Sequence, residues 1–234
     1  MARLVLIRHG KSTWNAQNRF TGWVDVPLSR RGRDASREAA RRMSEYGVVI
    51  DVCFTSPLIR AIETAMICLT EADGICAGRS AVLKHEAGDP DWRGWDHYQG
   101  DEDREVPVFM YRALGERCYG SLQGLHKDRT ADRVGQETLR RWRRSYWTRP
   151  PGGESLADTA ARTIPFLNGP VMRHLCAGKN TLVSAHGNSL RSIVMKLDAL
   201  DERDVAGLAI PMAVPMVYEI DAHGTVTDRT WLEG

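Results

Sequence analysis

Short runs of apolar residues alternate along the chain with longer segments whose apolar positions recur every three or four residues. The apolar runs at 4–7, 52–54, 181–185 and 216–220 predict strands. The first three runs lack an alternation of polar and apolar positions. That pattern is typical of strands that helices cover on both faces of a sheet.

Three segments between these strands predict helices. Residues 31–46 carry small and apolar side chains at helical spacing, at Ala35, Ala39, Ala40 and Met43. Residues 57–69 begin with a proline and repeat one apolar face, at Leu58, Ile62, Ala65 and Leu69. Ser155 and Asp158 have the spacing of a capping box that opens a third helix. The order of elements predicts an α/β fold with a mostly parallel central sheet and helices on both faces.

The middle of the chain follows neither pattern. Residues 84–113 mix acidic residues, glycine, proline and aromatic rings without a sustained period. Trp92, Trp95 and Tyr98 favour an ordered loop over a disordered linker, because linkers rarely carry so much apolar surface. A chain of 234 residues has the length of one large α/β domain. We therefore predict a single domain at 1–234 with an irregular insertion at about 84–113.

The composition of the chain indicates which classes of partner and which cellular location to expect. The 32 Lys and Arg residues nearly balance the 30 Asp and Glu residues, so no overall charge attracts nucleic acid or a membrane surface. The five cysteines are scattered and form no CxxC pair, which argues against a disulfide framework and a zinc site. The apolar run at 4–7 is too short for a signal peptide or a membrane span. These features predict a soluble, cytoplasmic protein.

Candidate chemistry gathers where three predicted strands end. Arg8, His9 and Gly10 follow the first strand, Arg60 lies about one helical turn beyond the second, and His186 follows the strand at 181–185. Ligands of open parallel sheets bind beyond the carboxyl ends of the strands. We therefore expect these three segments to face one pocket.

The residue types at these strand ends suit phosphoryl transfer. A neutral imidazole such as that of His9 attacks phosphorus when a hydrogen bond to one ring nitrogen leaves the other lone pair free. Arginine forks and a second histidine can neutralise the charge on the transferring group. Each His-Gly pair alone is more often part of a turn, but together with Arg60 they favour a site. No Walker loop, HExxH motif or carboxylate cluster with metal spacing occurs, so no metal is expected.

Several longer motifs follow one another in order along nearly the whole chain: RHGKSTWN, NRFTGWVDVPLSRRG, FTSPLIRAIETA, GERCYGSLQGLHK, WRRSYWTRPPGGESLADTAART and SAHGNSLRSIV. Together they resemble the cofactor-dependent phosphoglycerate mutases of the histidine phosphatase superfamily. The RHG motif indicates only the superfamily, which includes many phosphatases. The FTGW, ERCYGSLQGL and WRRSY blocks are more specific to the mutases.

The resemblance implies a role for each matching residue. His9 would be the phosphohistidine, with Arg8, Arg60 and His186 around the transferred group. Glu116 would be the general acid/base, a task that suits a carboxyl with a raised pKa. The remaining matches would contact substrate: Ser12, Asn15, Thr21, Gly22, Arg117, Tyr119, Lys127, Arg143, Arg144, Gly187 and Asn188. The cations among them suit a ligand that carries a carboxylate as well as a phosphate.

The same resemblance implies an activity. It is the interconversion of 3-phosphoglycerate and 2-phosphoglycerate in glycolysis and gluconeogenesis, primed by 2,3-bisphosphoglycerate without a metal. A homodimer or homotetramer is usual in the family. One alternative is a phosphomonoester phosphatase that uses the same histidine. A second is a non-catalytic protein that binds phosphorylated ligands.

Four features depart from the family pattern. Lys11 stands where glutamate or glutamine is common, which predicts a shifted phosphate affinity. Cys118 replaces a histidine, tyrosine or aspartate, and Ala213 stands where glycine is frequent, which matters only if that position needs a positive φ. The segment between WRRSY and GGESL is short, whereas 84–113 is long. We hypothesise that the long segment compensates by covering the pocket or by forming a subunit contact.

Overall fold

Seven strands form one central sheet within residues 1–85 and 100–233, the part of the chain that the computed structural model describes. In the order in which they lie across the sheet, they are β3 (Ser80–Lys84), β4 (Glu105–Met110), β2 (Val52–Thr55), β5 (Thr181–Ala185), β1 (Ala2–Arg8), β6 (Pro215–Ile220) and β7 (Val226–Trp231). Neighbours from β3 to β1 are parallel, and β6 and β7 are added antiparallel. The predicted mostly parallel sheet is confirmed, and each predicted strand lies within β1, β2, β5 or β6.

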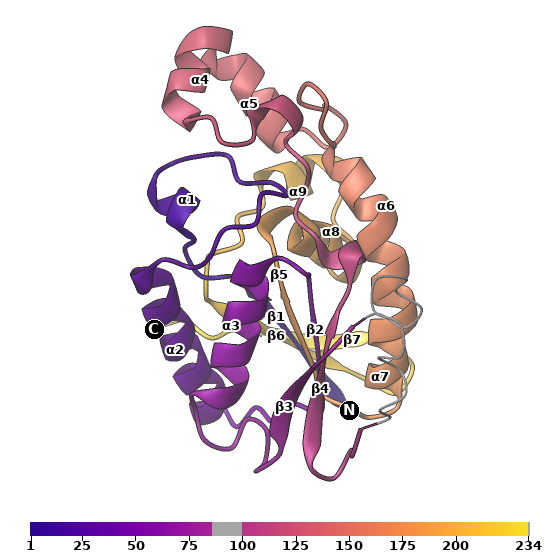
Figure 1. Ribbon diagram of the computed structural model, residues 1–234. Helices are drawn as coiled ribbons and strands as arrows, with labels where there is room; N and C mark the ends of the chain where they lie inside the picture. Colours follow the sequence, from indigo (N-terminus) through magenta and orange to yellow (C-terminus); the bar gives the residue numbers. More distant parts are fainter. Residues whose placement is uncertain (86–99, 234) are drawn as a thin grey trace.

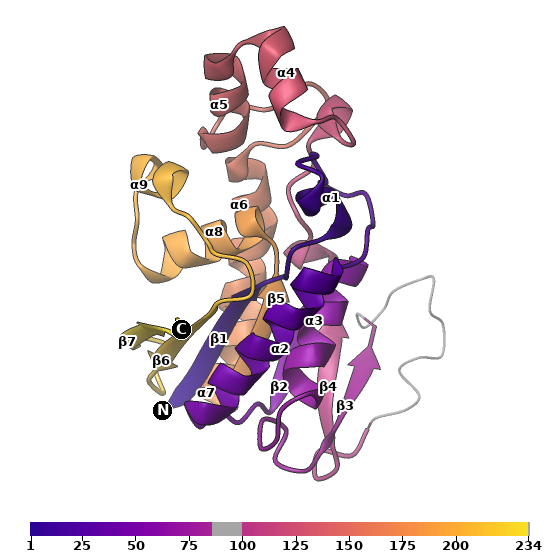
Figure 2. The same cartoon turned by 90° about the vertical axis from the view of Figure 1, so that its left-hand side faces the viewer.

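Helices cover both faces of this sheet (Figures 1 and 2). On one face lie α2 (Arg30–Glu45) and α3 (Ile59–Thr70), and on the other lie α6 (Leu156–Phe166), α7 (Met172–Cys176) and α8 (Gly187–Leu197). Successive residues of β1 point into opposite cores: Leu4 and Leu6 pack beneath α6 to α8, and Val5 and Ile7 pack beneath α2 and α3. Both faces are therefore apolar, which explains the lack of alternation in the sequence.

The three predicted helices are confirmed, and local signals explain where they begin. The hydroxyl of Ser29 caps α2 by accepting from the Gly32 amide at 3.1 Å. Ser155 caps α6 in the predicted manner, because its hydroxyl accepts from Asp158 N at 3.1 Å and its own amide donates to Asp158 Oδ2 at 2.8 Å. Helix α3 begins two residues after Pro57.

The prediction of an irregular segment at 84–113 is wrong for residues 105–110, which form β4 between β3 and β2. Pro107 obscured this strand, because proline lacks the amide that a central strand donates to its neighbours. Val106 and Val108 nevertheless alternate into the core. Residues 86–99, with the three aromatic residues that favoured an ordered loop, lie outside the described residues. The hypothesis of a cover or subunit contact stays a prediction.

A smaller group of helices lies beyond the carboxyl ends of the parallel strands (Figure 1). It contains α1 (Thr13–Ala16), α4 (Lys127–Val134), α5 (Gln136–Arg144) and α9 (Glu202–Gly207). Within the described ranges, short helical segments also form at Arg112–Leu114, Gly120–Leu122 and Leu167–Val171. Phe20, Leu122, Ala131 and Leu139 form a separate apolar cluster under α4 and α5. The space between the strand ends and this cluster holds the candidate site. No helix in the described ranges combines the length and the apolar character that a membrane span requires.

Candidate active site

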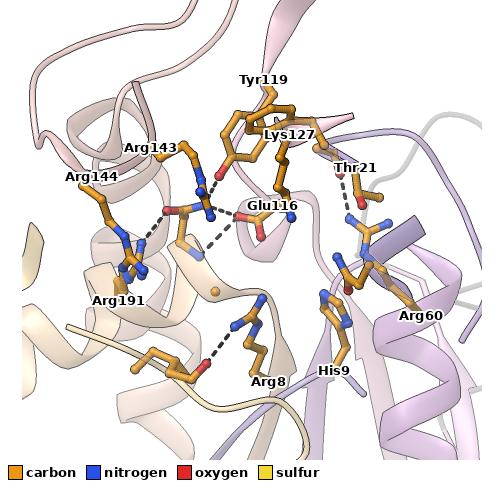
Figure 3. A pocket seen from close by; sticks show the side chains of 16 residues that line it. Arg8, His9, Thr21, Arg60, Glu116, Tyr119, Lys127, Arg143, Arg144 and Arg191 are labelled. Carbon is orange, nitrogen blue, oxygen red and sulfur yellow. Dashed lines mark hydrogen bonds between the residues drawn. The ribbon is translucent and has the colours of Figure 1, made fainter. Parts of the chain in front are cut away.

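A strongly cationic pocket lies at the carboxyl ends of β1 and β5 (Figure 3). Six cationic side chains and the single carboxylate of Glu116 contribute to its wall. The lining residues are Arg8, His9, Asn15, Phe20, Thr21, Gly22, Arg60, Glu116, Tyr119, Lys127, Arg143, Arg144, Gly187, Asn188, Arg191 and Ile210. Segments that are distant in the sequence thus converge on one volume, as the three strand ends predicted.

The His9 ring, directly after β1, is held in its neutral form. Its side chain is buried, and Nδ1 lies 2.7 Å from the carbonyl oxygen of Gly10. A carbonyl can only accept, so Nδ1 carries the proton and the Nε2 lone pair is free for attack. Burial lowers the pKa of His9 well below its usual value, and the nearby charges of His186, Arg60 and Arg8 lower it further. The ring is therefore uncharged at neutral pH.

The guanidinium groups of Arg60, which is buried, and Arg8, which is half-buried, flank His9 (Figure 3). Arg60 is 1% exposed and donates from Nη2 to Gly22 O at 2.7 Å and from Nη1 to Val24 O at 3.0 Å. Burial lowers its pKa to about 10, even though Glu116 acts in the opposite direction. Gly22 itself has a φ of 55°, a left-handed conformation that favours glycine. The carbonyl contacts fix the guanidinium without neutralising it, so an anion is the fitting ligand.

Arg8 approaches the pocket from β1 and is held by the chain after α9. Its Nη1 donates to Ile210 O at 2.8 Å. A Cβ atom at Gly187 would lie 3.3 Å from Arg8 Nε, so the absence of a side chain there lets α8 begin close to the guanidinium. The amino-terminal end of α8 adds amide dipoles that favour a negative charge.

His186 stands behind the lining as a neighbour of His9. The two ring centroids are 5.0 Å apart, and His186 Nε2 lies 2.6 Å from Ser56 Oγ. Burial, followed by the charges of Arg60 and Arg8, lowers the pKa of His186 well below its usual value. A neutral ring held between a serine and two arginines can donate a hydrogen bond to a phosphate oxygen without the cost of a buried cation.

Glu116 corrects an expectation from the sequence. Burial raises the pKa of this carboxyl, but hydrogen bonds from Arg117 N at 2.8 Å and from Asn188 Nδ2 at 2.8 Å, together with Arg8 and Arg60, bring the pKa below its ordinary value. The expected raised pKa is therefore wrong for the site without ligand. Glu116 is ionised there, and an ionised carboxyl is able to accept a proton.

The far end of the pocket holds cations with few counter-charges. Burial, and after it the charge of Arg143, lowers the pKa of Lys127 and of Arg144. Arg117 lies fully buried behind this wall, where Nη2 donates to Tyr119 Oη at 3.2 Å and to Arg143 O at 3.0 Å. Cations whose pKa values are lowered by burial and by a neighbouring cation favour an anionic ligand. The pocket thus offers anion contacts at both ends.

The family follows from comparison with known proteins. A model of the histidine phosphatase superfamily (branch 1) matches residues 4–86 and 98–231. The 2,3-bisphosphoglycerate-dependent phosphoglycerate mutase of Gloeothece citriformis is 52% identical over 98% of both chains, and mutase 1 of Gloeobacter violaceus is 53% identical over 94% of both chains. The chain belongs to the 2,3-bisphosphoglycerate-dependent phosphoglycerate mutases of the histidine phosphatase superfamily. The resemblance found in the sequence is confirmed.

Solved structures support the same superfamily fold. Bacillus stearothermophilus YhfR superimposes with a TM-score of 0.72 at 22% identity. The superposition covers 97% of this chain and 94% of the YhfR chain. A mycobacterial glucosyl-3-phosphoglycerate phosphatase superimposes with a TM-score of 0.69 at 21% identity, covering 99% and 96%. At this identity the likeness concerns the fold alone. Membership of the mutase family is shown by the relatives in sequence.

Most of the residues that the mutase resemblance singled out line the pocket, and three do not. Ser12 is buried as the N-cap of α1 and accepts from Asn15 N at 3.1 Å, while Arg117 and His186 lie in the layer behind the lining. Phe20, Arg191 and Ile210 line the pocket although the sequence analysis passed over them. Arg191 could have been found, because it follows Asn188 by three residues on a helix and therefore shares its face.

Proposed function

We propose that this chain interconverts 3-phosphoglycerate and 2-phosphoglycerate through a phosphoryl group carried on His9, primed by 2,3-bisphosphoglycerate. The observation that carries the proposal is the neutral His9 ring, with Nε2 free, at one end of a pocket whose other end is lined by Lys127, Arg143 and Arg144. A phosphatase needs only the end that contains His9. A ligand that carries a carboxylate or a second phosphate in addition to the transferred phosphate needs both ends.

The pocket fits a bisphosphorylated priming ligand because it offers six cationic side chains against one carboxylate. When bound, 2,3-bisphosphoglycerate supplies the first phosphoryl group. Arg8, Arg60 and His186 would hold the transferring group, and Tyr119 with the cations at the far end would hold the second phosphate or the carboxylate. Among the described residues, no cluster of three or more His, Cys, Asp or Glu side chains could hold a metal ion. Independence from metal stays a prediction, which the assay below tests.

His9 and Glu116 divide the chemistry between them. His9 Nε2 holds the phosphoryl group. As the hydroxyl oxygen of the substrate bonds to phosphorus and the P–N bond breaks, Glu116 takes the proton of that hydroxyl. For removal of the phosphoryl group from the other carbon, Glu116 returns a proton to the departing oxygen while the P–N bond forms again. Arg8 and Arg60 lower the Glu116 pKa in the site without ligand, so phosphate bound between them would raise it. The same carboxyl can thus act in both directions.

The activity is tested by following isomerisation and phosphate release together. Purified protein is assayed with 3-phosphoglycerate in EDTA, with and without 2,3-bisphosphoglycerate. We expect rapid isomerisation that bisphosphate stimulates, with little phosphate released, and its loss in His9→Ala. His223→Asn removes an exposed histidine that does not line the pocket, and it serves as the matched control. Phosphate release without isomerisation would assign the chain to the phosphatases.

The proposal also includes predictions about assembly, location and partners. Assembly as a homodimer or homotetramer and a cytoplasmic location, with no nucleic acid or membrane partner, belong to this proposal as predictions. Sedimentation velocity of the purified chain measures the first of them.

A further inference from the structure

Arg191 lines the pocket and lies within the SAHGNSLRSIV motif, but no role was predicted for it from the sequence. It lies on α8, one turn beyond Asn188, and its guanidinium is fixed in two directions. Nε donates to Leu208 O at 2.7 Å, and Nη1 donates to Asn188 Oδ1 at 3.3 Å. Figure 3 shows Arg191 at the wall of the pocket together with Arg144, which donates to the same Leu208 carbonyl at 3.4 Å.

The other end of the Asn188 amide faces Glu116. Asn188 Nδ2 donates to Glu116 Oε1 at 2.8 Å, and the Asn188 backbone amide donates to the same oxygen at 3.2 Å. A guanidinium only donates and a carboxylate only accepts, so the two neighbours demand one orientation of the amide. Turned by 180°, the amide would place oxygen against the carboxylate and NH2 against the guanidinium. Both contacts would then be repulsive.

We propose that Arg191 is a positioning residue for the mutase reaction: it holds the Asn188 amide in the orientation that donates to Glu116, and so aims the Glu116 carboxylate. The inference rests on the proposed function, in which Glu116 moves the substrate proton. Arg191 does not need to contact the substrate to act in this way. Its effect passes through two hydrogen bonds, from Arg191 to Asn188 and from Asn188 to Glu116.

The chain of contacts predicts a change in pH dependence. A hydrogen bond to the charged form of a carboxyl lowers its pKa, so loss of the Asn188 contact would raise the pKa of Glu116. The charged and titratable groups that face this carboxyl are Arg8 from β1, Arg60 from α3, Tyr119, and Arg191 from α8. Removal of Arg191 leaves the first three in place. The acid limb of kcat/KM then moves to higher pH.

A double-mutant cycle tests whether Arg191 acts through Asn188. Isomerisation is measured from about pH 3.5 to pH 9 for the wild type, Arg191→Met, Asn188→Ala and the double variant, because the pKa of Glu116 lies below the ordinary glutamate value of about 4.3. We expect Arg191→Met to lower kcat by about tenfold, the scale of one hydrogen bond to a charged group, and to shift the acid limb upward. In the Asn188→Ala background the second substitution should change little, because the contact it would break is already absent.

Arg144→Met is the matched control, since it removes a neighbouring guanidinium that shares the Leu208 carbonyl. We expect it to raise KM and to leave the acid limb in place. Urea unfolding establishes that each variant is folded, and Arg191→Leu, which also lacks a donor, replaces Arg191→Met where the latter does not fold. Independent effects in the double variant, or a raised KM with an unmoved acid limb in Arg191→Met, would overturn the inference. A wild-type chain without isomerisation would instead refute the proposed function.

Discussion

The first turn of α2 packs its backbone against the loop that follows His9, and Gly32 is the point of closest approach. Ser29 N and Ser29 Oγ donate to Lys11 O at 2.9 and 2.7 Å. A Cβ atom at Gly32 would lie 2.2 Å from Lys11 O and 2.8 Å from Lys11 N, whereas ordinary contact begins at 3.4 Å. Both neighbours are backbone atoms, so no side chain can rotate away. Gly32→Ala must move the loop or the helix.

The size of the effect follows from two opposing contributions. Alanine favours a helix over glycine by up to about 1 kcal/mol, while overpacking a closed contact costs about 1–3 kcal/mol. With a backbone clash at the upper end of that range, we expect the free energy of unfolding to fall by about 1–2 kcal/mol. For a chain of this size that lowers Tm by roughly 2–8 °C. Because Gly10 O orients the His9 ring from the same loop, we also expect kcat to fall by about a hundredfold.

Urea unfolding and the isomerisation assay measure both effects on the same preparation. Gly207→Ala is the matched control, because Gly207 ends a helix and a Cβ atom there would meet no other atom within 4 Å. We expect that variant to be fully active and as stable as the wild type or slightly more so. A Gly32→Ala protein with wild-type stability and activity would refute the argument that the helix holds the His9 loop by direct backbone contact.

Three further predictions concern the left-handed conformation of Ala213, the protonation of His9 and the support of the Glu116 backbone. Ala213 has a φ of 55°, which costs an alanine about 1–2 kcal/mol. Ala213→Gly should therefore raise the free energy of unfolding by up to about 1 kcal/mol in urea; a decrease would show that the buried methyl group matters more. Burial and the nearby cations lower the pKa of His9. Phosphoryl uptake from radiolabelled bisphosphoglycerate should therefore persist as the pH falls through 6.5 and be lost only well below that value. A loss centred at pH 6.5 or above would contradict a neutral His9 ring. Arg162 donates to the carbonyls of Ala113 and Gly115 at 2.8 Å and of Glu116 at 3.0 Å. Arg162→Met should lower the unfolding free energy by about 3 kcal/mol in urea and reduce kcat, and unchanged values of both would exclude a supporting role.

Local patterns in the sequence predicted the part of the molecule that local physics controls. Apolar runs located four strands, the Ser155–Asp158 capping box located the start of α6, and the polar residues after β1, β2 and β5 pointed to one edge of the sheet. That edge does hold His9, Arg60 and His186 close together, because parallel strands place their carboxyl ends side by side. The family motifs added Glu116 and the distant cations, which no periodicity could have brought to the same pocket.

Tertiary structure decided what depends on several segments at once. Pro107 argued against a central strand, yet β3 and β2 on either side hold β4 in the sheet. The pKa of Glu116 is lowered because its hydrogen bonds and the two arginines that face it come from separate parts of the chain, and their combined field outweighs burial. Arg191 gains its position through Leu208 and Asn188, contacts that no spacing rule ties to Glu116. The sequence by itself determined which groups meet at the strand ends, and only the folded chain determined their protonation and orientation, because both depend on distances between segments that no local pattern records.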